Sequence, residues 1–379
     1  MKAILVDDEA LALDFLEHQV NKVASIEVIG TFNYLDIEKD AAHLEEVDVV
    51  FLDIEMPEIN GLELAEKILE IDADISIVFV TAFNDYAVQA FDLNALDYLL
   101  KPLQLNRLKK TMERVELKAN KQIHKPLVKN NMLRVNVSRE LSFELTKNKP
   151  EIIKWRTTKT KELFLYLLHH CDKTVRKSEL IELLWTDFQE DRAYSQLYTA
   201  IYHIRKALNK YSAHFKIKNM GEGYVLSTKN VFIDLVEWER KISFAPPINS
   251  ETIISYEKNM KLYTGPFLKE YEYLWAEAER HRLVQLWLKT AYQMAGYYEN
   301  QDNMEKAKTW FVKICTTSPE EEDAQFSLMK IYSRLGFSLQ IDRQYYQLAN
   351  ALEELGLEVS PHVSKWFKQW KTRQTQVKP

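Results

Sequence analysis

The chain has 379 residues, 46% of them hydrophobic and 28% charged, so it can bury more than one core and should divide into two or three domains. No apolar run reaches the roughly 20 residues of a membrane span, which excludes a membrane-spanning protein. The first residues read as a strand rather than a signal peptide, so a cytoplasmic location is expected. Cys171 and Cys315 lie far apart in helical patterns and read as buried small hydrophobes, so neither a disulfide framework nor a cysteine metal cluster is expected.

The net charge of −6 is unevenly distributed along the chain. Residues 1–118 contain 10 Lys and Arg against 25 Asp and Glu, residues 119–231 contain 21 against 11, and residues 232–379 contain 19 against 20. An acidic, a basic and a nearly neutral region therefore follow one another. This pattern indicates that only the middle region contacts a polyanion.

The acidic region alternates short apolar runs with amphipathic stretches. We predict five strands, at residues 3–6, 27–30, 49–52, 75–80 and 97–100. The helices between and after them should begin near Ala10, Asp36, Gly61, Asp85 and Leu105. Five such strand–helix units predict an α/β domain with a doubly wound, five-stranded parallel sheet.

Polar residues stand at the ends of four of these strands. Asp7 and Asp8 follow the first strand, Asp53 the third, Thr81 the fourth and Lys101 the fifth. Three carboxylates at one sheet edge repel one another unless a cation joins them, which predicts a Mg²⁺ site. The ammonium of Lys101 and the hydroxyl of Thr81 would hold a phosphoryl group, and Asp53 would be the nucleophile that accepts it.

Each of these residues taken singly has an ordinary structural reading, as a helix cap, a turn residue or a loop. Taken together and in order, they resemble the receiver domain of two-component response regulators, and the resemblance extends over residues 1–118. The motifs that carry it are Asp7-Asp8, Leu52-Asp53, Met56-Pro57, Gly61, Thr81-Ala82, Tyr98 and Lys101-Pro102. Residues 81–102 look like those of receivers attached to LytTR-type outputs.

The resemblance implies that Asp53 is phosphorylated by a sensor histidine kinase, with Thr81 and Lys101 assisting. Thr81 and Tyr98 would form the pair that repacks when the phosphoryl group arrives. The implied ligands of Mg²⁺ are Asp8, Asp53, Asp7 through water, and the backbone carbonyl of Glu55. Pairing of two receivers into a homodimer is an arrangement that the sequence leaves open.

Residues 119–131 are rich in lysine and are predicted to be a linker. The basic region, residues 132–230, should begin with short strands at residues 133–137, 141–145 and 152–155. Helices should follow from Thr157, at residues 177–185 and at residues 193–211, and a hairpin should close the region at residues 215–226. Three helices and a terminal hairpin predict a winged helix-turn-helix domain that binds DNA.

The third helix of this region is expected to lie in the major groove. Its apolar face is made by Leu197, Ile201, Ile204 and Leu208. The opposite face and the hairpin offer hydroxyl, amide, imidazole and basic groups that can reach base edges and phosphates. The predicted DNA-contacting residues are Ser195, Gln196, Tyr198, Thr199, Tyr202, His203, Lys206, Lys216 and Lys218. The alternative reading is an ordinary solvated face, and His203 alone is equally consistent with a structural role.

This region resembles the OmpR-type winged helix. The residues that carry the resemblance are Lys161-Glu-Leu163, Leu167-Leu168, Leu180, Leu184-Trp185, Ile204 to Leu208 and Gly221 to Tyr224. Tyr202 and His203 stand where many relatives have arginines, and Met220 stands where an arginine is common. The resemblance therefore does not transfer an operator sequence.

Residues 231–370 are predicted to be helical, with a 34-residue repeat typical of tetratricopeptide units, so an all-α solenoid is expected. Residues 371–379 would be a tail. Residues 232–365 resemble the bacterial transcriptional activator domain, which follows a winged helix in SARP-type regulators. The motifs are Asp234, residues 262–268, residues 273–275, Arg280, Arg282-Leu283, residues 318–322, Leu328-Met329 and residues 352–356.

The leading hypothesis is a phosphorylation-controlled transcriptional regulator whose partners are double-stranded DNA, a sensor kinase, and RNA polymerase or another protein bound by the solenoid. The alternative is a phosphorylation-controlled scaffold that acts through the solenoid alone. An enzyme acting on other molecules is disfavoured. The acid two residues beyond Asp53 is Glu55, and the sequence provides no supporting set of residues that would make it a general acid.

Overall fold

A computed structural model describes residues 1–23, 26–44, 46–57, 59–72, 74–93, 95–119, 132–146 and 149–377. These residues fall into two units, Met1–Leu133 with Ile152–Val231 and Arg134–Glu151 with Phe232–Pro379. Within the described ranges, no helix is long and apolar enough to cross a membrane. The predicted linker, residues 119–131, lies outside the described residues from position 120 onward.

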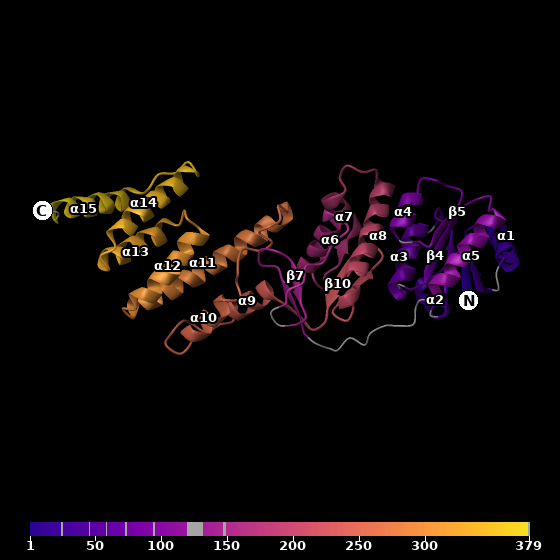
Figure 1. Ribbon diagram of the computed structural model, residues 1–379, viewed down its shortest axis with the longest axis horizontal. Coiled ribbons are helices and arrows are strands. Elements are labelled where there is room, and N and C mark those ends of the chain that lie inside the picture. Colours follow the sequence, from indigo (N-terminus) through magenta and orange to yellow (C-terminus); the bar gives the residue numbers. More distant parts are fainter. Residues whose placement is uncertain are drawn as a thin grey trace. The chain divides into compact units, whose positions relative to one another are not determined.

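The first unit begins with the parallel sheet expected for the acidic region, and this prediction is confirmed (Figure 1). The strands lie in the order β2-β1-β3-β4-β5, and every neighbouring pair is parallel. Their bounds are Lys2–Val6 for β1, Glu27–Phe32 for β2, Val49–Leu52 for β3, Ser76–Thr81 for β4 and Asp97–Leu100 for β5. The order reverses between β1 and β3, which is where open α/β sheets bind ligands.

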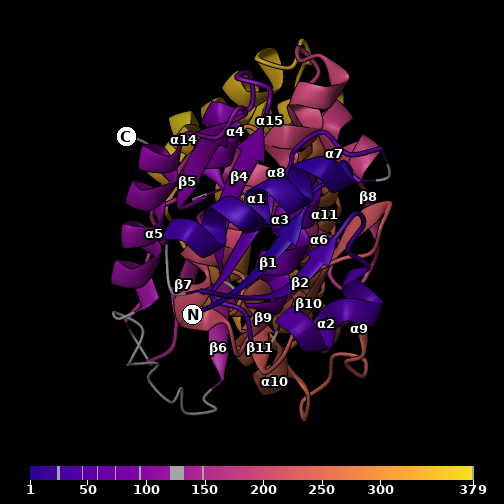
Figure 2. The same cartoon turned by 90° about the vertical axis from the view of Figure 1, so that its right-hand side faces the viewer.

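Helices cover both faces of this sheet, as the continuous burial of successive residues in β1, β3 and β4 requires. Their bounds are Ala10–Val23 for α1, Ile37–Leu44 for α2, Gly61–Ile71 for α3, Ala87–Asp92 for α4 and Leu105–Ala119 for α5. Figure 2 shows α1 and α5 in front of the sheet. Leu16 of α1 and Leu108 of α5 pack there with Leu5 and Phe51 in one buried cluster. The core thereby fixes the strand ends that carry the polar residues.

The rest of the first unit contains the three helices and the hairpin expected for the basic region. The elements are α6 (Thr158–His169), β8 (Val175–Arg176), α7 (Lys177–Leu184), α8 (Glu190–Ala207), β9 (Phe215–Asn219) and β10 (Gly223–Thr228). Strands β8, β10 and β9 form an antiparallel sheet in that order. A Cβ atom at Gly223 would lie 2.4 Å from the carbonyl oxygen of Val175, so only glycine permits this close approach of strands.

The second unit includes a small sheet that the sequence analysis had placed with the basic region. Strands β11 (Val231–Ile233), β6 (Leu133–Asn136) and β7 (Ser142–Glu144) form it in that order. The side chain of Asp234 accepts hydrogen bonds from the backbone N–H groups of Val137 and Ser138, about a hundred residues earlier in the chain. These long-range bonds explain why residues 134–151 group with the helical region. The third strand expected there, residues 152–155, is absent, and an isolated bridge joins Phe143 to Glu151 instead.

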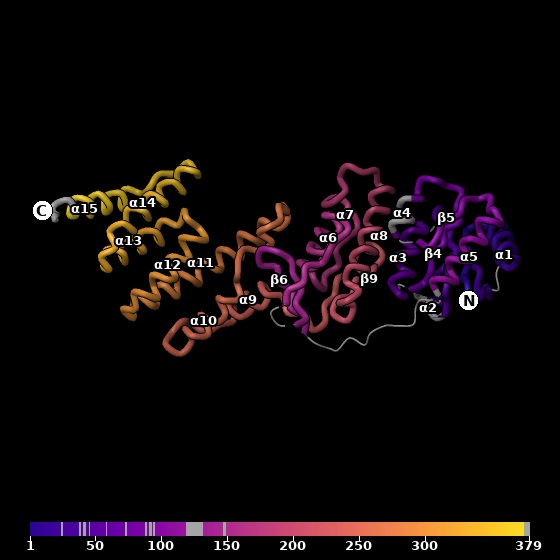
Figure 3. Tube along the Cα trace, viewed as in Figure 1, coloured from indigo at the N-terminus to yellow at the C-terminus, as the bar shows by residue number. Residues whose placement is uncertain are grey.

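Helices make up most of the second unit, and the trace in Figure 3 follows them in succession. They are α9 (Asp234–Ser243), α10 (Ile253–Met260), α11 (Glu277–Asn300), α12 (Met304–Thr317), α13 (Glu322–Arg334), α14 (Ser338–Glu353) and α15 (Pro361–Val377). From α11 to α14, each helix packs against the next. Residues 371–377, expected in a tail, continue helix α15.

Candidate functional site

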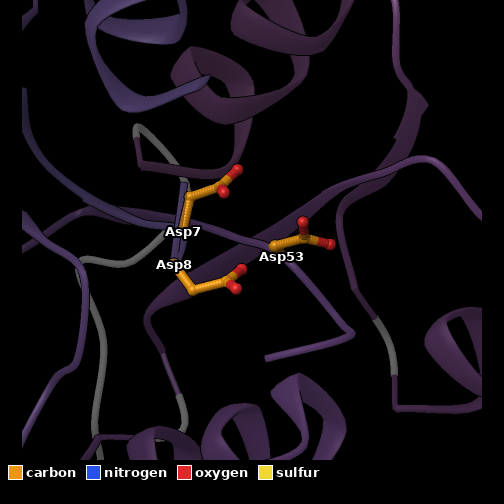
Figure 4. A group of neighbouring side chains, drawn as sticks. All are labelled: Asp7, Asp8 and Asp53. Atoms are coloured by element: carbon orange, nitrogen blue, oxygen red, sulfur yellow. The ribbon is translucent and has the colours of Figure 1, made fainter. Parts of the chain in front are cut away.

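Three carboxylates meet at the carboxyl edge of the parallel sheet (Figure 4). Asp7 and Asp8 follow β1, and Asp53 follows β3, the strand beside it. Ligand atoms of all three lie within 4.8 Å of one another. Asp7 and Asp53 are buried, and Asp8 is exposed, so the cluster opens toward solvent on one side. Burial raises the pKa of the Asp7 carboxyl above its ordinary value, against the opposing effect of Lys101.

The ammonium of Lys101 completes this cluster from the end of β5. Its Nζ lies 2.7 Å from a carboxylate oxygen of Asp53 and 2.7 Å from one of Asp7. Burial alone lowers the pKa of Lys101, but the hydrogen bonds to Asp53 and Asp7 outweigh burial and raise it above its ordinary value. Lys101 therefore stays protonated and compensates part of the negative charge.

The remaining residues predicted for this site lie on the adjacent strand ends. Thr81 ends β4 and is fully buried. Tyr98 lies on β5, and its hydroxyl donates a hydrogen bond to the backbone carbonyl of Phe83, two residues beyond Thr81. Burial, together with the charge of Asp53, raises the pKa of Tyr98 to about 12. Glu55 is on the loop after β3, and its carboxylate accepts a hydrogen bond from the hydroxyl of Tyr86 over 3.3 Å.

The loop that carries Asp53 is fixed by the start of α3. Asn60 caps this helix with its side chain, which accepts a hydrogen bond from the backbone N–H of Leu62 over 2.8 Å. Gly61 donates its N–H to the carbonyl of Ile54 over 2.7 Å. A Cβ atom at Gly61 would lie 2.0 Å from the backbone oxygen of Asp53. The glycine in the motif is therefore required for this close packing.

The predicted DNA-contacting residues of α8 do not all lie on an exposed face. Ser195, Tyr198 and Thr199 are buried, whereas the sequence predicted that they lie on an exposed face that contacts DNA. In the same helix, Gln196, Tyr202 and His203 are half-buried, and Lys206 is exposed. Lys216 and Lys218 are exposed on β9, where they alternate with buried residues.

Helix α8 is partly covered because it packs against α3 and α4 of the same unit (Figure 1). Three carboxylates of α3, those of Glu63, Glu66 and Glu70, form a row toward α8 and the hairpin. Arg205 of α8 forms ion pairs with both Glu66 and Glu70. The hydroxyl of Tyr198 donates a hydrogen bond to Glu63 over 3.0 Å.

Residues from α7 and the hairpin bind the same α3 row. Lys177 Nζ lies 2.6 Å from Glu63. Asn219 donates hydrogen bonds from its backbone N–H to Glu70 and from its side chain to Glu66, and the hydroxyl of Tyr224 also donates to Glu66. A cationic and polar surface of α7, α8 and the hairpin is therefore neutralised by an acidic helix.

The two outer carboxylates of the α3 row respond differently to this environment. Burial raises the pKa of Glu63, but the hydrogen bond and charge of Lys177 outweigh it and hold this pKa below its ordinary value. At Glu70, burial dominates over the charge of Arg205 and raises the pKa. Sequence reasoning missed this row. The spacing of three and four residues, which places the acids on one helix face, was the only local signal of it.

Two family descriptions match separate parts of the chain. Residues 3–113 match the response regulator receiver domain, and residues 245–369 match the bacterial transcriptional activator domain. A response regulatory protein of Vibrio cholerae is 43% identical over 128 residues, which are 34% of this chain and 53% of that protein. The transcriptional regulatory protein LytR of Staphylococcus aureus is 33% identical over 145 residues, which are 38% of this chain and 59% of LytR. The chain thus spans little more than half the length of these relatives.

Solved structures give similar matches. The response regulatory domain of MrkE from Klebsiella pneumoniae is 38% identical, covering 32% of this chain and 100% of that one, with a TM-score of 0.30. The response regulator DrrB of Thermotoga maritima is 22% identical, covering 60% of this chain and 98% of that one, with a TM-score of 0.26. By its family matches, the chain contains a response regulator receiver domain and, after it, a bacterial transcriptional activator domain.

Proposed function

We propose that the protein is a phosphorylation-controlled, DNA-binding regulator of transcription. A sensor histidine kinase would supply a phosphoryl group to Asp53, and the segment from α6 to β10 would act as a winged helix on double-stranded DNA. The solenoid of the second unit, which we take to be tetratricopeptide-like, would engage RNA polymerase or another protein. The receiver accepts the group on its own side chain, so the protein is a regulator rather than an enzyme that acts on other molecules.

One observation carries the proposal: the arrangement of Lys101 between Asp53 and Asp7 at the sheet edge. A carboxylate oxygen of Asp53 would attack the phosphorus atom while the bond to the donor's leaving group breaks. Lys101, already at hydrogen-bond distance, would hold the transferred oxygens, and the hydroxyl of Thr81 would do so from the next strand. Tyr98 and Thr81 would then change their packing together.

The donor set of the acid cluster fits Mg²⁺. Three carboxylates with ligand atoms within 4.8 Å of one another, one of them exposed, match the preference of this cation for a few carboxylate oxygens and several waters. Asp8 and Asp53 would hold it directly, Asp7 through water, and Glu55 through its backbone carbonyl. When bound, the cation would neutralise charge on the phosphoryl group.

Phosphorylation is tested with a small-molecule phosphodonor, Mg²⁺ and the full-length protein, followed by intact mass measurement. Asp53→Asn should abolish the incorporation of phosphate. Asp48→Asn is the matched control, because Asp48 precedes the same strand at its opposite end and accepts a hydrogen bond from the N–H of Lys2. Equal incorporation in the Asp53 variant and the wild type would refute the proposal.

The contact between α3 and α8 supports a link between the two activities. Arg205, Tyr198 and Lys177 belong to the segment proposed to bind DNA, and each is held by a carboxylate of the receiver. A change at Asp53 would reach α3 through the loop whose close packing depends on Gly61. We propose that phosphorylation weakens this contact and frees α8.

The DNA-binding part of the proposal is tested separately by electrophoretic mobility shift with genomic fragments. A shift that weakens steeply with salt is expected, because contacts to several phosphates release counterions. If no fragment shifts in either phosphorylation state, the winged-helix assignment fails, and the alternative of a protein-interaction scaffold is favoured. That outcome would leave the chemistry of Asp53 intact.

A further inference from the structure

A cavity of about 730 Å³ opens in the second unit among α10, α11, α12 and the loop that follows α10 (Figure 1 labels the helices). This volume falls in the range of small-molecule sites. None of its lining residues takes part in the phosphoryl chemistry or in the proposed contacts with DNA. The cavity is therefore separate from both proposed sites.

Aromatic side chains form much of the apolar wall. Tyr263, Trp287 and Trp310 line the cavity, and both tryptophans are 5% exposed. The ring centroids of Tyr263 and Trp287 lie 5.8 Å apart. Trp238, fully buried behind them, lies 4.9 Å from Tyr263 by the same measure. This rigid group offers flat surface on which a ring can pack.

The polar part of the lining is strongly cationic, although residues 232–379 as a whole are close to neutral. Five basic residues line the cavity against a single carboxylate, that of Glu257. Two of the five are already paired in the structure: Lys306 lies 3.0 Å from Glu257, and Arg139 lies 3.6 Å from Glu270. Across the described ranges, no carboxylate is within ion-pairing distance of the other three, Lys261, Lys269 and Lys313.

The wall also contains a buried hydroxyl that is not satisfied by the protein. The hydroxyl of Tyr263 is buried and has no hydrogen-bond partner within the part of the chain that the structure describes. Most buried hydroxyls in folded proteins are paired, so a small rotation that exposed this hydroxyl to the cavity would let it gain a hydrogen bond from a polar ligand atom. This observation is independent of the charge of the lining.

We propose that the cavity binds a small organic anion that combines an aromatic ring with a carboxylate or phosphate group. The ring would pack against Trp287 and Tyr263, and the acidic group would meet Lys269 and Lys313. The ammonium of Lys313 already lies 4.0 Å from the ring centroid of Trp310, so the charged and aromatic parts of the site adjoin. The activator domain would then respond to a metabolite in addition to the phosphoryl group, and this inference does not depend on the chemistry of Asp53.

The first experiment measures binding of 1-anilinonaphthalene-8-sulfonate to the full-length protein by fluorescence. Replacing both Lys269 and Lys313 by Gln should weaken binding of this aromatic anion about tenfold, as expected for two partly exposed charge pairs. The neutral analogue N-phenyl-1-naphthylamine should bind both proteins alike. Lys330→Gln is the matched control, because Lys330 also lies over an aromatic ring, 4.5 Å from the centroid of Phe326, but does not line the cavity.

A second variant tests the location. Thr309 is exposed on α12 and lines the cavity, so Thr309→Trp should fill the space and abolish binding of both probes without disturbing the core. Competition with adenosine monophosphate and with 2-naphthoate then distinguishes a phosphate from a carboxylate ligand. The proposal is overturned if the lysine variants leave the sulfonate affinity unchanged, if Thr309→Trp still binds it, or if neither competitor displaces it.

Discussion

The guanidinium of Arg205 forms an ion pair with the carboxylate of Glu66, although 139 positions separate them in the chain and the side chain of Glu66 is fully buried. Burying a carboxylate without a charged partner costs free energy. Glu66 has Arg205 as its partner only while α8 lies against α3. The pair therefore joins the receiver to the segment proposed to bind DNA. It also makes that junction sensitive to single substitutions.

The first prediction concerns this junction. Glu66→Gln should weaken the contact between α3 and α8 by about 2 kcal/mol, because Arg205 loses its fully buried charged partner and keeps only Glu70. If α8 cannot bind DNA while it lies against α3, the apparent DNA affinity is the intrinsic affinity multiplied by the fraction of molecules in which α8 is free. The variant has a larger free fraction, so it should bind DNA at least about tenfold more tightly. Fluorescence anisotropy with a labelled duplex measures this change.

Glu113→Gln is the control for that experiment, because it makes the same charge change at an exposed position of α5. An equal gain in both variants would mean that reduced repulsion of DNA, rather than release of α8, explains the result. An unchanged affinity in Glu66→Gln would show that the contact does not limit DNA binding.

The second prediction concerns Lys101. Lys101→Met removes the ammonium that lies 2.7 Å from both Asp53 and Asp7, so the carboxylates of the cluster are left to repel one another. Adding Mg²⁺ should then raise the unfolding temperature more in the variant than in the wild type. At a free Mg²⁺ concentration of about 100 times its dissociation constant, binding should stabilise the folded state by about 2.7 kcal/mol. Differential scanning calorimetry, with NaCl of matched ionic strength as control, tests this, and an equal response of the two proteins would contradict it.

The third prediction concerns Gly61. A Cβ atom there would lie 2.0 Å from the backbone oxygen of Asp53, so Gly61→Ala should force the loop to move and destabilise the receiver by about 1–3 kcal/mol. Phosphorylation of Asp53 should slow as well. Gly296→Ala provides the contrast: nothing lies within 4 Å of a Cβ in this helical position, and the change should stabilise α11 by about 1 kcal/mol. The unfolding temperatures of both variants, measured by thermal unfolding, test this prediction. Similar changes in unfolding temperature for the two variants would contradict the packing explanation.

The fourth prediction is a pH dependence located at Asp97. Burial raises the pKa of this carboxyl, but hydrogen bonds from Arg107 and Thr111 outweigh burial and hold it below its ordinary value of 3.8. A lowered folded-state pKa gives stability that is present above pH 3.8 and is lost as pH falls through the folded-state value. Asp97→Asn should remove this dependence and weaken the attachment of α5 to β5 by about 2 kcal/mol.

Hydrogen exchange of the β5 and α5 amides, compared at about pH 6 and about pH 3, measures this effect apart from the other domains after correction for intrinsic exchange rates. The wild type should lose more protection on acidification than Asp97→Asn. Equal losses would assign the acid sensitivity of this region to other carboxylates.

The sequence predicts the receiver nearly completely because its signals are local. Apolar runs mark the strands, and Asp7, Asp53 and Lys101 stand immediately after them, so the rule that parallel strands end at one edge brings these residues together. The helices and hairpin of the basic region were located by similar local patterns.

What sequence reasoning missed depends on pairing across long distances in the chain. Strand β6 lies beside β11, and Asp234 binds the N–H groups of Val137 and Ser138, so residues 134–151 fold with a region that begins almost a hundred positions later. Tyr198 and Ser195 fit the polar face of an isolated helix. Their burial follows from the packing of α8 against α3, which cannot be read from the sequence of α8 alone.

The last prediction concerns the exposed lysines of the hairpin. Lys216 and Lys218 are exposed on β9, where they alternate with the buried residues Phe215 and Ile217, so they are accessible for phosphate contacts, although the charge of Lys216 also acts on Glu70 of the α3 row. Replacing each by Gln should lower DNA affinity uniformly across sequences and reduce the slope of log affinity against log salt by about 1 per lysine. Lys371→Gln, on α15, removes an equal charge outside the proposed winged helix and should leave the slope unchanged. If the hairpin variants keep the wild-type slope while binding persists, the hairpin does not contact the backbone, and the proposed docking of the winged helix must be revised.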